Sequence, residues 1–476
     1  MSLTDQARGL VDRVVANNTW RQRNCFNLIP SENTPSLLVK MMEISDPAGR
    51  YAEHRTMKGK EVYFYQGIDF IQAVEEECRA AMCQYFDCPR AELRPISGQM
   101  ANEIVFKAVT AYVNRGRAEG EPFRRLRTVM NNDLTLGGHL SSQPMGALFN
   151  YVERDAEDHD KVVNFPIRKD NLYKPDVAKL LEMLPDVRPE LIVFGKSMFL
   201  YPEPVQEVYA LVKDWDPRPV IMYDMAHVLG LYGAFQAPLA EGADVVTGST
   251  HKTFFGPQRG VIASTMAKGT TFGKLWLQIK SRAFPGSTSN HHLGTLLALL
   301  MATHEMNAFK QEYQDQVRRN AKAWARALAA AGLDVQGDPD DGYTETHQVV
   351  VRVSTHGPAE EIARRLEENN IVCNYQALPD DETFLKSSGI RTGVPEMTRF
   401  GMREEHFERL AELFADCVVR NQPVAEAVSA YRQQFSQMHY CLPAGEAAEM
   451  AARILASVFP RSDYAKAFAE RLAAHV

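Results

Sequence analysis

Short, uninterrupted runs of apolar residues recur along the first two thirds of the chain, separated by segments with helical patterning. The runs occupy residues 128–130, 191–194, 220–223, 245–246 and 261–263. A continuous apolar run is typical of a strand that is buried on both faces of a parallel sheet. Segments such as 175–183 and 204–213 have the apolar spacing of helices. The pattern predicts an α/β fold in which a large, doubly wound, mainly parallel sheet occupies residues 55–300.

The pattern changes near residue 293. Residues 293–331 are rich in alanine, leucine and charged residues, which predicts a long helix between two domains. The elements expected beyond it are strands at 347–353 and 371–375, and helices at 359–369, 404–421 and 426–437. We therefore expect residues 301–476 to form this linker helix and a smaller α+β C-terminal domain, with extra helices from about residue 445. Residues 1–54 are interrupted by prolines and predict an N-terminal helix and arm.

Composition narrows the classes of partner. The 476 residues are 45% hydrophobic, which is enough to bury a large core, and the net charge of −7 offers no broad basic surface for nucleic acid. The 7 cysteines have the spacing of neither a disulfide framework nor a zinc site. No apolar run approaches the roughly 18 residues of a membrane span, and no signal peptide is evident. We expect a cytoplasmic protein with no metal, membrane or nucleic-acid partner.

Two residues at the ends of predicted strands suggest a particular chemistry. Lys252 follows the run at 245–246 in a polar, glycine-flanked turn, and Asp224 ends the run at 220–223. A buried lysine amine has a lowered pKa and can attack a carbonyl, such as the aldehyde of pyridoxal phosphate (PLP). PLP also needs a carboxylate against its pyridine nitrogen. The carboxyl ends of parallel strands are where α/β sheets bind ligands, although a solvated lysine and a helix-capping aspartate would give the same pattern.

Two further segments fit the same cofactor. Ser97 and Gly98 form a turn that leads into an apolar helical stretch, and hydroxyl and N–H groups at a helix start can hold a phosphate. His139 follows two glycines, and its imidazole could stack on a flat pyridine ring. Either segment by itself is common in proteins. The four together, in this order, point to PLP.

In this order, the segments resemble the serine hydroxymethyltransferase family of fold-type-I PLP enzymes over most of the chain. Residues 28–33 resemble its Ser-Glu-Asn segment and residues 50–53 its Tyr-x-Glu segment. Residues 65–67 stand at its Tyr-Gly-Gly, and residues 389–398 resemble its substrate-carboxylate arginine segment. The resemblance implies the fold-type-I architecture, PLP as cofactor, and a homodimer whose active sites are shared between subunits.

The resemblance also implies roles for individual residues. Lys252 would form the Schiff base, Asp224 would pair with the pyridine nitrogen, and His139 would stack on the ring. The other cofactor contacts would be Ser97, Gly98, Gln99, Ser197, His227, His251 and Gly286. Arg391 would bind the amino-acid carboxylate as a bidentate fork, with Ser31, Tyr51 and Tyr65 nearby. Glu53 would be the acid–base group at the substrate's β-hydroxyl, and Thr250 would assist exchange of the Schiff base.

The implied reaction makes or breaks the Cα–Cβ bond of 3-hydroxy amino acids through a glycine quinonoid. Its acceptor is left open, because several folate-facing positions differ from the family pattern. Phe64 replaces a tyrosine, Gln66 replaces a glycine, and Gln376 stands near an expected asparagine. Four additional residues lie within 54–60, and residues 287–292 replace a glycine-rich segment. Similar departures at residues 256–258, 289–292 and 346–349 resemble the threonine transaldolase branch, which transfers glycine to a larger aldehyde without tetrahydrofolate. Glu53 and its Tyr-x-Glu segment are more similar to the hydroxymethyltransferases, so the sequence lies between the two.

Two other readings share part of this pattern. A fold-type-I aminotransferase or decarboxylase would also carry Asp224, Lys252 and a C-terminal arginine, but it would not be expected to carry Glu53 or residues 31–33. A catalytically silent relative would keep the fold without needing Lys252, Asp224 and Arg391 together. The sequence therefore favours aldol-type chemistry at a PLP site.

Overall fold

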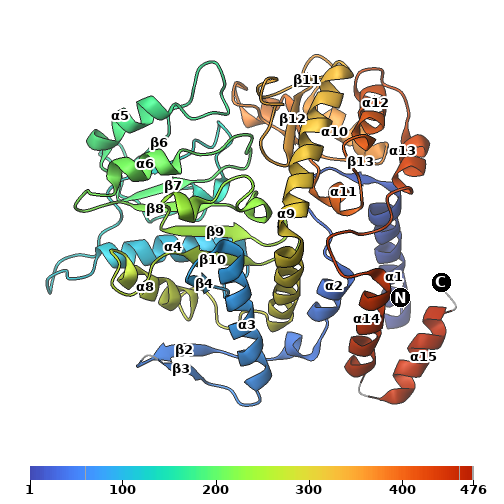
Figure 1. The fold of residues 1–476 in the computed structure, drawn as a ribbon, viewed down its shortest axis with the longest axis horizontal. Helices are drawn as coiled ribbons and strands as arrows, with labels where there is room; N and C mark the ends of the chain where they lie inside the picture. Colours follow the sequence, from blue (N-terminus) through green and yellow to red (C-terminus); the bar gives the residue numbers. More distant parts are fainter. Residues whose placement is uncertain (59, 460, 474–476) are drawn as a thin grey trace.

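A seven-stranded sheet forms the centre of the computed structural model, which describes residues 1–58, 60–459 and 461–473 (Figure 1). Its strands lie in the order β4-β10-β9-β8-β7-β5-β6. They are β4 (Arg90–Glu92), β10 (Gly260–Ser264), β9 (Val245–Ser249), β8 (Val220–Asp224), β7 (Leu191–Phe194), β5 (Val129–Asn131) and β6 (Val162–Asn164). Strands β6, β5, β7, β8 and β9 pair in parallel, whereas β10 is antiparallel to both of its neighbours.

Side chains of the central strands alternate between two hydrophobic cores, one on each face of the sheet. Along β7, Ile192 and Phe194 pack into one core, whereas Leu191 and Val193 pack into the other. This alternation follows from the two-residue period of a strand. Because both faces are buried, nearly every residue of these strands is apolar. Each such side chain stabilises the fold by about 1.5–3 kcal/mol relative to an exposed one.

Helices cover both faces of this sheet. Helices α4 (Gly98–Val113) and α8 (Gly273–Ala283) contribute to one core. The opposite core receives α3 (Asp69–Phe86), α5 (Val177–Val187), α6 (Val205–Val212) and the long helix α9 (Leu293–Ala330). The sheet is therefore doubly wound, as the apolar runs predict.

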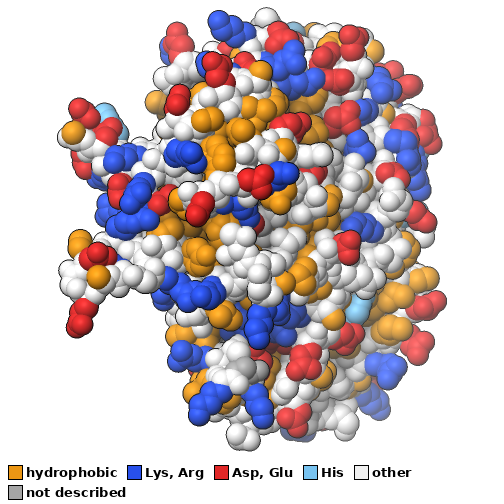
Figure 2. Space-filling view, turned by 60° about the vertical axis from the view of Figure 1, so that its left-hand side comes forward, with side chains coloured by type: hydrophobic (Ala, Val, Ile, Leu, Met, Phe, Trp, Pro, Cys, Tyr) orange, Lys and Arg blue, Asp and Glu red, His pale blue; other side chains and the backbone are white. Residues whose placement is uncertain are grey.

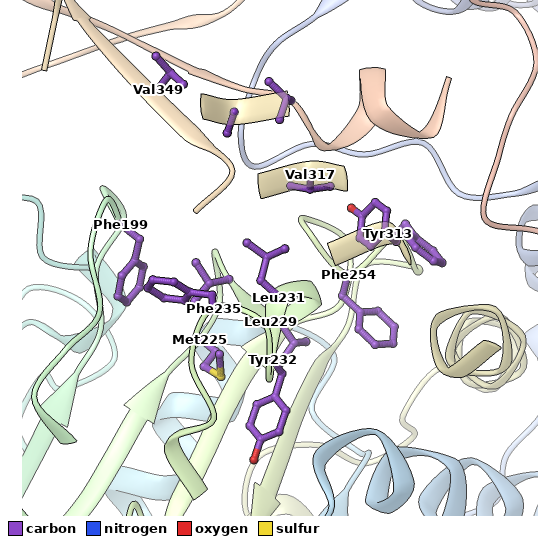
Figure 3. Packing of buried hydrophobic residues seen from close by; sticks show 14 of the residues in the cluster. Phe199, Met225, Leu229, Leu231, Tyr232, Phe235, Phe254, Tyr313, Val317 and Val349 are labelled. Atoms are coloured by element: carbon purple, nitrogen blue, oxygen red, sulfur yellow. The ribbon is translucent and has the colours of Figure 1, made fainter. Parts of the chain in front are cut away.

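A second, four-stranded sheet lies beyond α9. Its order is β11-β12-β15-β14, formed by β11 (Asp334–Val335), β12 (Gln348–Arg352), β15 (Gly389–Gly393) and β14 (Asn374–Gln376), all antiparallel. Helices α9 and α10 (Ala359–Glu368) pack against it, and α12 (His406–Val418) packs against these two helices. Leu229 and Leu231 follow β8 of the large sheet. Figure 3 shows them near Tyr313 and Val317 of α9, with Val349 of the small sheet beyond. One core therefore extends across both sheets.

The remaining elements belong to the chain ends and connections. Near the N-terminus are α1 (Leu3–Thr19), β1 (Phe26–Asn27), α2 (Leu37–Glu43) and the hairpin β2 (His54–Met57) and β3 (Lys60–Tyr63). Later elements are α7 (Pro238–Glu241), β13 (Ile371–Val372), α11 (Pro395–Arg399), α13 (Ala425–Arg432), α14 (Ala444–Val458) and α15 (Ser462–Ala473). Short helical segments are η1 (Trp20–Asn24), η2 (Asp46–Gly49), η3 (Leu140–Ser142), η4 (Leu229–Leu231) and η5 (Phe384–Lys386). Strand β1 pairs in parallel with β13 and ties the N-terminal arm to the C-terminal part.

These elements confirm the predicted α/β class with a mainly parallel central sheet. One predicted strand differs, since residues 371–375 form two short strands: β13 pairs with β1, and β14 pairs with β15. The chain changes partner between them, which an apolar run cannot reveal. On the face drawn in Figure 2, acidic and basic side chains are interspersed, with no broad field of one sign. None of the helices described has the length and apolar character needed to cross a bilayer.

Candidate active site at the edges of the two sheets

Lys252 lies in the turn that follows β9. The buried strand ends at Ser249, and the chain then turns back towards β10. The Lys252 Nζ atom is 3.2 Å from Nε2 of His227. Burial lowers the pKa of Lys252 to about 8, with Asp224 opposing that shift and Arg391 adding to it. A substantial fraction of the amine is therefore neutral, and hence nucleophilic, near neutral pH.

Asp224 ends the neighbouring strand β8, and its backbone is paired with Thr247 of β9. Its carboxylate accepts hydrogen bonds from Asn102 Nδ2 at 2.7 Å and from the Ala226 N–H at 2.9 Å. Nδ1 of His139 lies 2.5 Å from the Asp224 Oδ2 atom. Burial alone would raise the pKa of Asp224, but His139 and these hydrogen bonds lower it below its ordinary value. The site therefore holds a buried, ionised carboxylate.

Two histidines flank this carboxylate and the lysine. The rings of His139 and His227 meet edge to face, with centroids 5.4 Å apart. Burial, reinforced by Lys252, lowers the pKa of His227 well below its ordinary value. The Nδ1 atom of His227 is buried without a hydrogen-bond partner among the described residues. His227 is thus a neutral ring with one nitrogen free to contact a bound molecule.

Arg391 approaches this cluster from the small sheet. Its Nη1 donates to the Ser197 carbonyl oxygen at 2.8 Å and its Nε to Asn374 Oδ1 at 3.3 Å. Burial lowers the pKa of Arg391 to about 10, and no carboxylate pairs with it within the described part of the chain. A buried guanidinium without a counter-ion is a natural site for the carboxylate of a ligand.

The expected phosphate segment forms the start of α4. Ser97 is the N-cap, and its hydroxyl accepts the Met100 N–H at 3.1 Å. A Cβ atom on Gly98 would lie 2.2 Å from Ser249 Oγ, so the start of α4 packs directly against the end of β9. Gln99 is exposed in the first turn. The helix start therefore presents N–H groups beside the end of β9, where an anion can bind.

His251, Thr250, Ser197 and Gly286 have different surroundings. The His251 Nδ1 atom is buried without a partner among the described residues, and burial lowers the pKa of this residue to about 4. The Thr250 hydroxyl donates to the Pro257 carbonyl at 2.6 Å and thereby holds the turn together.

The Ser197 hydroxyl lies 3.4 Å from the Gly137 and Gly138 carbonyls. Gly286 lies beside the middle of α4, where Lys107 Nζ donates to its carbonyl oxygen at 3.3 Å.

The remaining substrate residues fall into two groups. Ser31 and His251 line the same polar cavity, of about 790 Å³. Tyr51 and Tyr65 instead lie on the surface, with ring centroids 5.3 Å apart, and line a separate cavity of about 670 Å³. Glu53 lies in the same segment, next to the β2–β3 hairpin. Tyr51 and Tyr65 therefore line a different cavity from Ser31 and from His251, the residue next to Lys252.

Sequence reasoning missed several residues of the site. Asn102 and Ser142 both contact the Asp224 carboxylate. Asn102 lies one helical turn after Gly98, a spacing that places both on one face of α4 and that could have identified it. His347 is fully buried, its Nε2 lies 3.1 Å from the Pro30 carbonyl oxygen, and burial lowers its pKa to about 3. Residues 346–349 resemble the threonine transaldolase branch, but that resemblance assigned no role to His347.

These groups fit PLP. The structure places a partly neutral amine, an ionised carboxylate and a helix start at one edge of the sheet. Nδ1 atoms of His227 and His251 are buried there without partners among the described residues. A flat, anionic molecule with an aldehyde and a ring nitrogen would engage these groups. The fold and the site together define a PLP-dependent enzyme of fold type I.

Comparisons with known proteins identify the family. The family model described as serine hydroxymethyltransferase matches residues 4–414. A serine hydroxymethyltransferase from Pyrobaculum islandicum is 36% identical, covering 92% of this chain and 95% of that protein. One from Methanosphaera stadtmanae is 35% identical, covering 94% and 98%. The chain belongs to the serine hydroxymethyltransferase family, and the predicted family and cofactor are confirmed.

A solved structure gives a second comparison. The crystal structure of an L-threonine transaldolase from Pseudomonas fluorescens in its internal aldimine state matches with a TM-score of 0.78. The two sequences are 26% identical, and the match covers 94% of this chain and 98% of that chain. The predicted fold-type-I architecture is therefore confirmed. Family membership also weighs against the aminotransferase or decarboxylase alternative.

Proposed function

We propose that the protein is a PLP-dependent transferase that breaks and makes the Cα–Cβ bond of 3-hydroxy amino acids, with serine or threonine as donor and glycine as the amino-acid product. The observation that carries this proposal is the meeting of Lys252, Asp224 and Arg391 at the edges of the two sheets. Bound PLP supplies an aldehyde carbon for an amine and a sink for the electron pair that Cα–Cβ cleavage releases. Residues of the chain supply the nucleophile, the proton-holding groups and the binding of the substrate carboxylate.

Each of the three residues has one task. The Lys252 amine is the nucleophile, and burial keeps part of it neutral near pH 8. Asp224 would hold a proton on the pyridine nitrogen of bound PLP, because its carboxylate is 1% exposed and fixed by His139 and Asn102. Arg391 would bind the amino-acid carboxylate and thereby orient the substrate. Ser31 lies in the adjoining cavity and assists that binding.

The proton at the β-hydroxyl is assigned to Glu53 of a second copy. Tyr51 and Tyr65 line a surface cavity that is separate from the cavity of His251, next to Lys252, and Glu53 follows Tyr51 closely in the same segment of the chain. A homodimer in which this segment covers the partner's site would bring the two halves together. Symmetry would then give two equivalent sites in each dimer. This assignment makes the homodimer part of the proposed function.

For the acceptor we favour a free aldehyde over tetrahydrofolate. Phe64 lacks the hydroxyl of the tyrosine expected there, and the β2–β3 hairpin (His54–Met57 and Lys60–Tyr63) accommodates the additional residues beside Glu53. A site built to hydrogen-bond a ring loses much of its selectivity when such groups are missing. The structural likeness to a threonine transaldolase supports the same choice.

The test is product analysis by mass spectrometry. Purified, PLP-loaded protein is given L-serine or L-threonine, each with and without tetrahydrofolate, and L-threonine with benzaldehyde as a probe acceptor. Lys252→Ala serves as the control. We expect glycine and acetaldehyde from threonine without folate, and a new 3-hydroxy amino acid when benzaldehyde is present. Glycine formed from serine only with folate would make the protein a folate-dependent hydroxymethyltransferase. An amino-group transfer product, or no product, would contradict aldol chemistry.

A further inference from the structure

A buried ion pair lies beside the candidate site and has no part in the chemistry described above. Lys196 and Glu203 are each 3% exposed, and Nζ of Lys196 is 2.7 Å from Oε1 of Glu203. The same Nζ donates to the Tyr173 carbonyl oxygen at 3.1 Å. Two charges taken out of water are costly unless both are well paired. Such a pair is therefore a weak source of stability and needs another explanation.

The residues on either side of Lys196 contact both the large-sheet residues of the site and Arg391 of the small sheet. On one side, the Gly195 carbonyl oxygen accepts the His139 N–H at 3.0 Å. A Cβ atom on Gly195 would lie 2.7 Å from Cβ of Asp224, so this loop packs directly against the carboxylate residue. On the other side, the Ser197 carbonyl oxygen accepts Nη1 of Arg391 at 2.8 Å. Residues 195–197 thus connect Asp224 and His139 to Arg391.

The ion pair fixes this loop through a closed set of hydrogen bonds. Asn132 Nδ2 donates to Oε2 of Glu203 at 2.9 Å, while its Oδ1 accepts the Gly195 N–H at 2.8 Å. Gln236 holds the backbone of Glu203, donating to its carbonyl oxygen at 2.6 Å and accepting its N–H at 3.1 Å. Tyr223, next to Asp224 on β8, donates to the same Gln236 oxygen at 2.8 Å. The loop is therefore anchored to Asn132 at the end of β5 and, through Gln236, to Tyr223 of β8.

We propose that Lys196 and Glu203 are positioning residues, which set the place of the Arg391 guanidinium relative to the Asp224 carboxylate. The distance between these groups decides whether an amino acid held by its carboxylate lies correctly over the cofactor ring. A misplacement of about 1 Å in such an arrangement costs about 10²-fold in rate. The inference rests on the proposed roles of Arg391 and Asp224, and it adds two residues that touch neither substrate nor cofactor.

The test compares this pair with a second, largely buried ion pair, which lies at the starts of β8 and β9. Arg218 Nη2 lies 2.5 Å from Oδ1 of Asp244, and Asp244 accepts the N–H of Ile221 near the start of β8. The variants are Lys196→Met, Glu203→Gln, the double variant, and Arg218→Met as the matched control. Each PLP-loaded protein is measured by urea unfolding, by the pH dependence of cofactor absorbance, by the spectral dissociation constant for L-serine, and by kcat/KM for the amino-acid donor.

We expect Lys196→Met and Arg218→Met to lose stability alike, because each leaves a buried carboxylate without its cation. Only Lys196→Met should also weaken serine binding, with about a 10²-fold loss in kcat/KM. The double variant should recover serine binding relative to Lys196→Met, because no lone buried charge remains. If Lys196→Met does not fold, Glu203→Gln, which keeps the side-chain shape, replaces it in the comparison.

Two results would overturn the inference. One is a folded Lys196 or Glu203 variant with the parental serine dissociation constant and absorbance titration. The other is an equal loss of serine binding in Arg218→Met, which would make the effect one of general stability. These results differ from a failure of the proposed function, in which the parent protein itself would bind neither PLP nor serine.

Discussion

The residues expected at the active site lie in two regions with opposite surroundings. At the edges of the two sheets, Asp224 is 1% exposed and Arg391 is 7% exposed, and both are held by hydrogen bonds. In the segment around β2, by contrast, the Tyr51 side chain is 49% exposed and Tyr65 is 41% exposed. One region binds charge in a low-dielectric environment, whereas the other presents aromatic rings to solvent. This difference is what the proposed homodimer, in which each chain supplies part of the other's site, would produce.

The exposed region is nevertheless firmly anchored. His54, which follows Glu53, is 2% exposed, and its Nε2 lies 3.2 Å from Oε1 of Glu75 on α3. On the hairpin, Glu61 pairs with Lys280 at 2.5 Å. A loop held in place while its aromatic side chains remain exposed suits a surface that a second copy covers. This is the physical basis for assigning the segment to the partner's site in the proposed dimer.

The largest effect is expected in the buried region, from Lys252→Ala. Loss of the amine should abolish the absorbance band of lysine-bound cofactor and reduce turnover of threonine by at least about 10²–10⁴-fold. Absorbance spectroscopy and product formation measure the two losses, and Lys213→Ala, an exposed lysine variant, is the control. An unchanged cofactor band in Lys252→Ala would contradict the role of this lysine.

Much of the buried region could be predicted from the sequence. The apolar runs at 191–194 and 220–223 correspond closely to β7 and β8, because strands buried on both faces must be apolar throughout. Lys252 and Asp224 could be placed for a related reason, since each follows directly from the end of such a strand. The assembly of Arg391 with them depends on the fold of a second sheet, and only the family resemblance indicated it.

Other features could not be read from the sequence, for identifiable reasons. The β2–β3 hairpin consists mainly of exposed polar residues, so no apolar pattern marks its strands. Lys196 and Glu203 look like ordinary surface residues until the fold buries them. The proposed roles of Tyr51 and Glu53 require contacts with another chain, which local patterning does not encode. The features that could not be predicted are mostly pairings between polar groups that are far apart in the sequence.

A complementation experiment tests the division of the site between two copies. Glu53→Gln and Lys252→Ala should each be nearly inactive as pure proteins, because one damages the surface segment and the other the buried region. In a one-to-one mixture with subunit exchange, half of the dimers would be hybrids with one intact site in each. Activity should then recover to about a quarter of the parental value.

The mixture needs its own control for exchange. Different affinity tags on the two variants, followed by sequential purification, isolate the hybrids for assay. Isolated hybrids without activity would show that Glu53 and Lys252 act within one chain. Sedimentation of the parent as an active monomer would contradict the shared site altogether.

The smallest expected effect concerns the electrostatics of the buried region alone. Without cofactor, the neutral form of Lys252 should increase with pH around a midpoint of about 8, because burial disfavours its ammonium form. Labelling with acetic anhydride at a series of pH values, read by peptide mass spectrometry, measures that midpoint, and the exposed Lys213 is the internal reference. The Asp224 charge raises the pKa of Lys252, so Asp224→Asn should move the midpoint downward. A midpoint near 10.5, the ordinary value for lysine, would show that the amine is solvated and that the two regions differ less than their burial indicates.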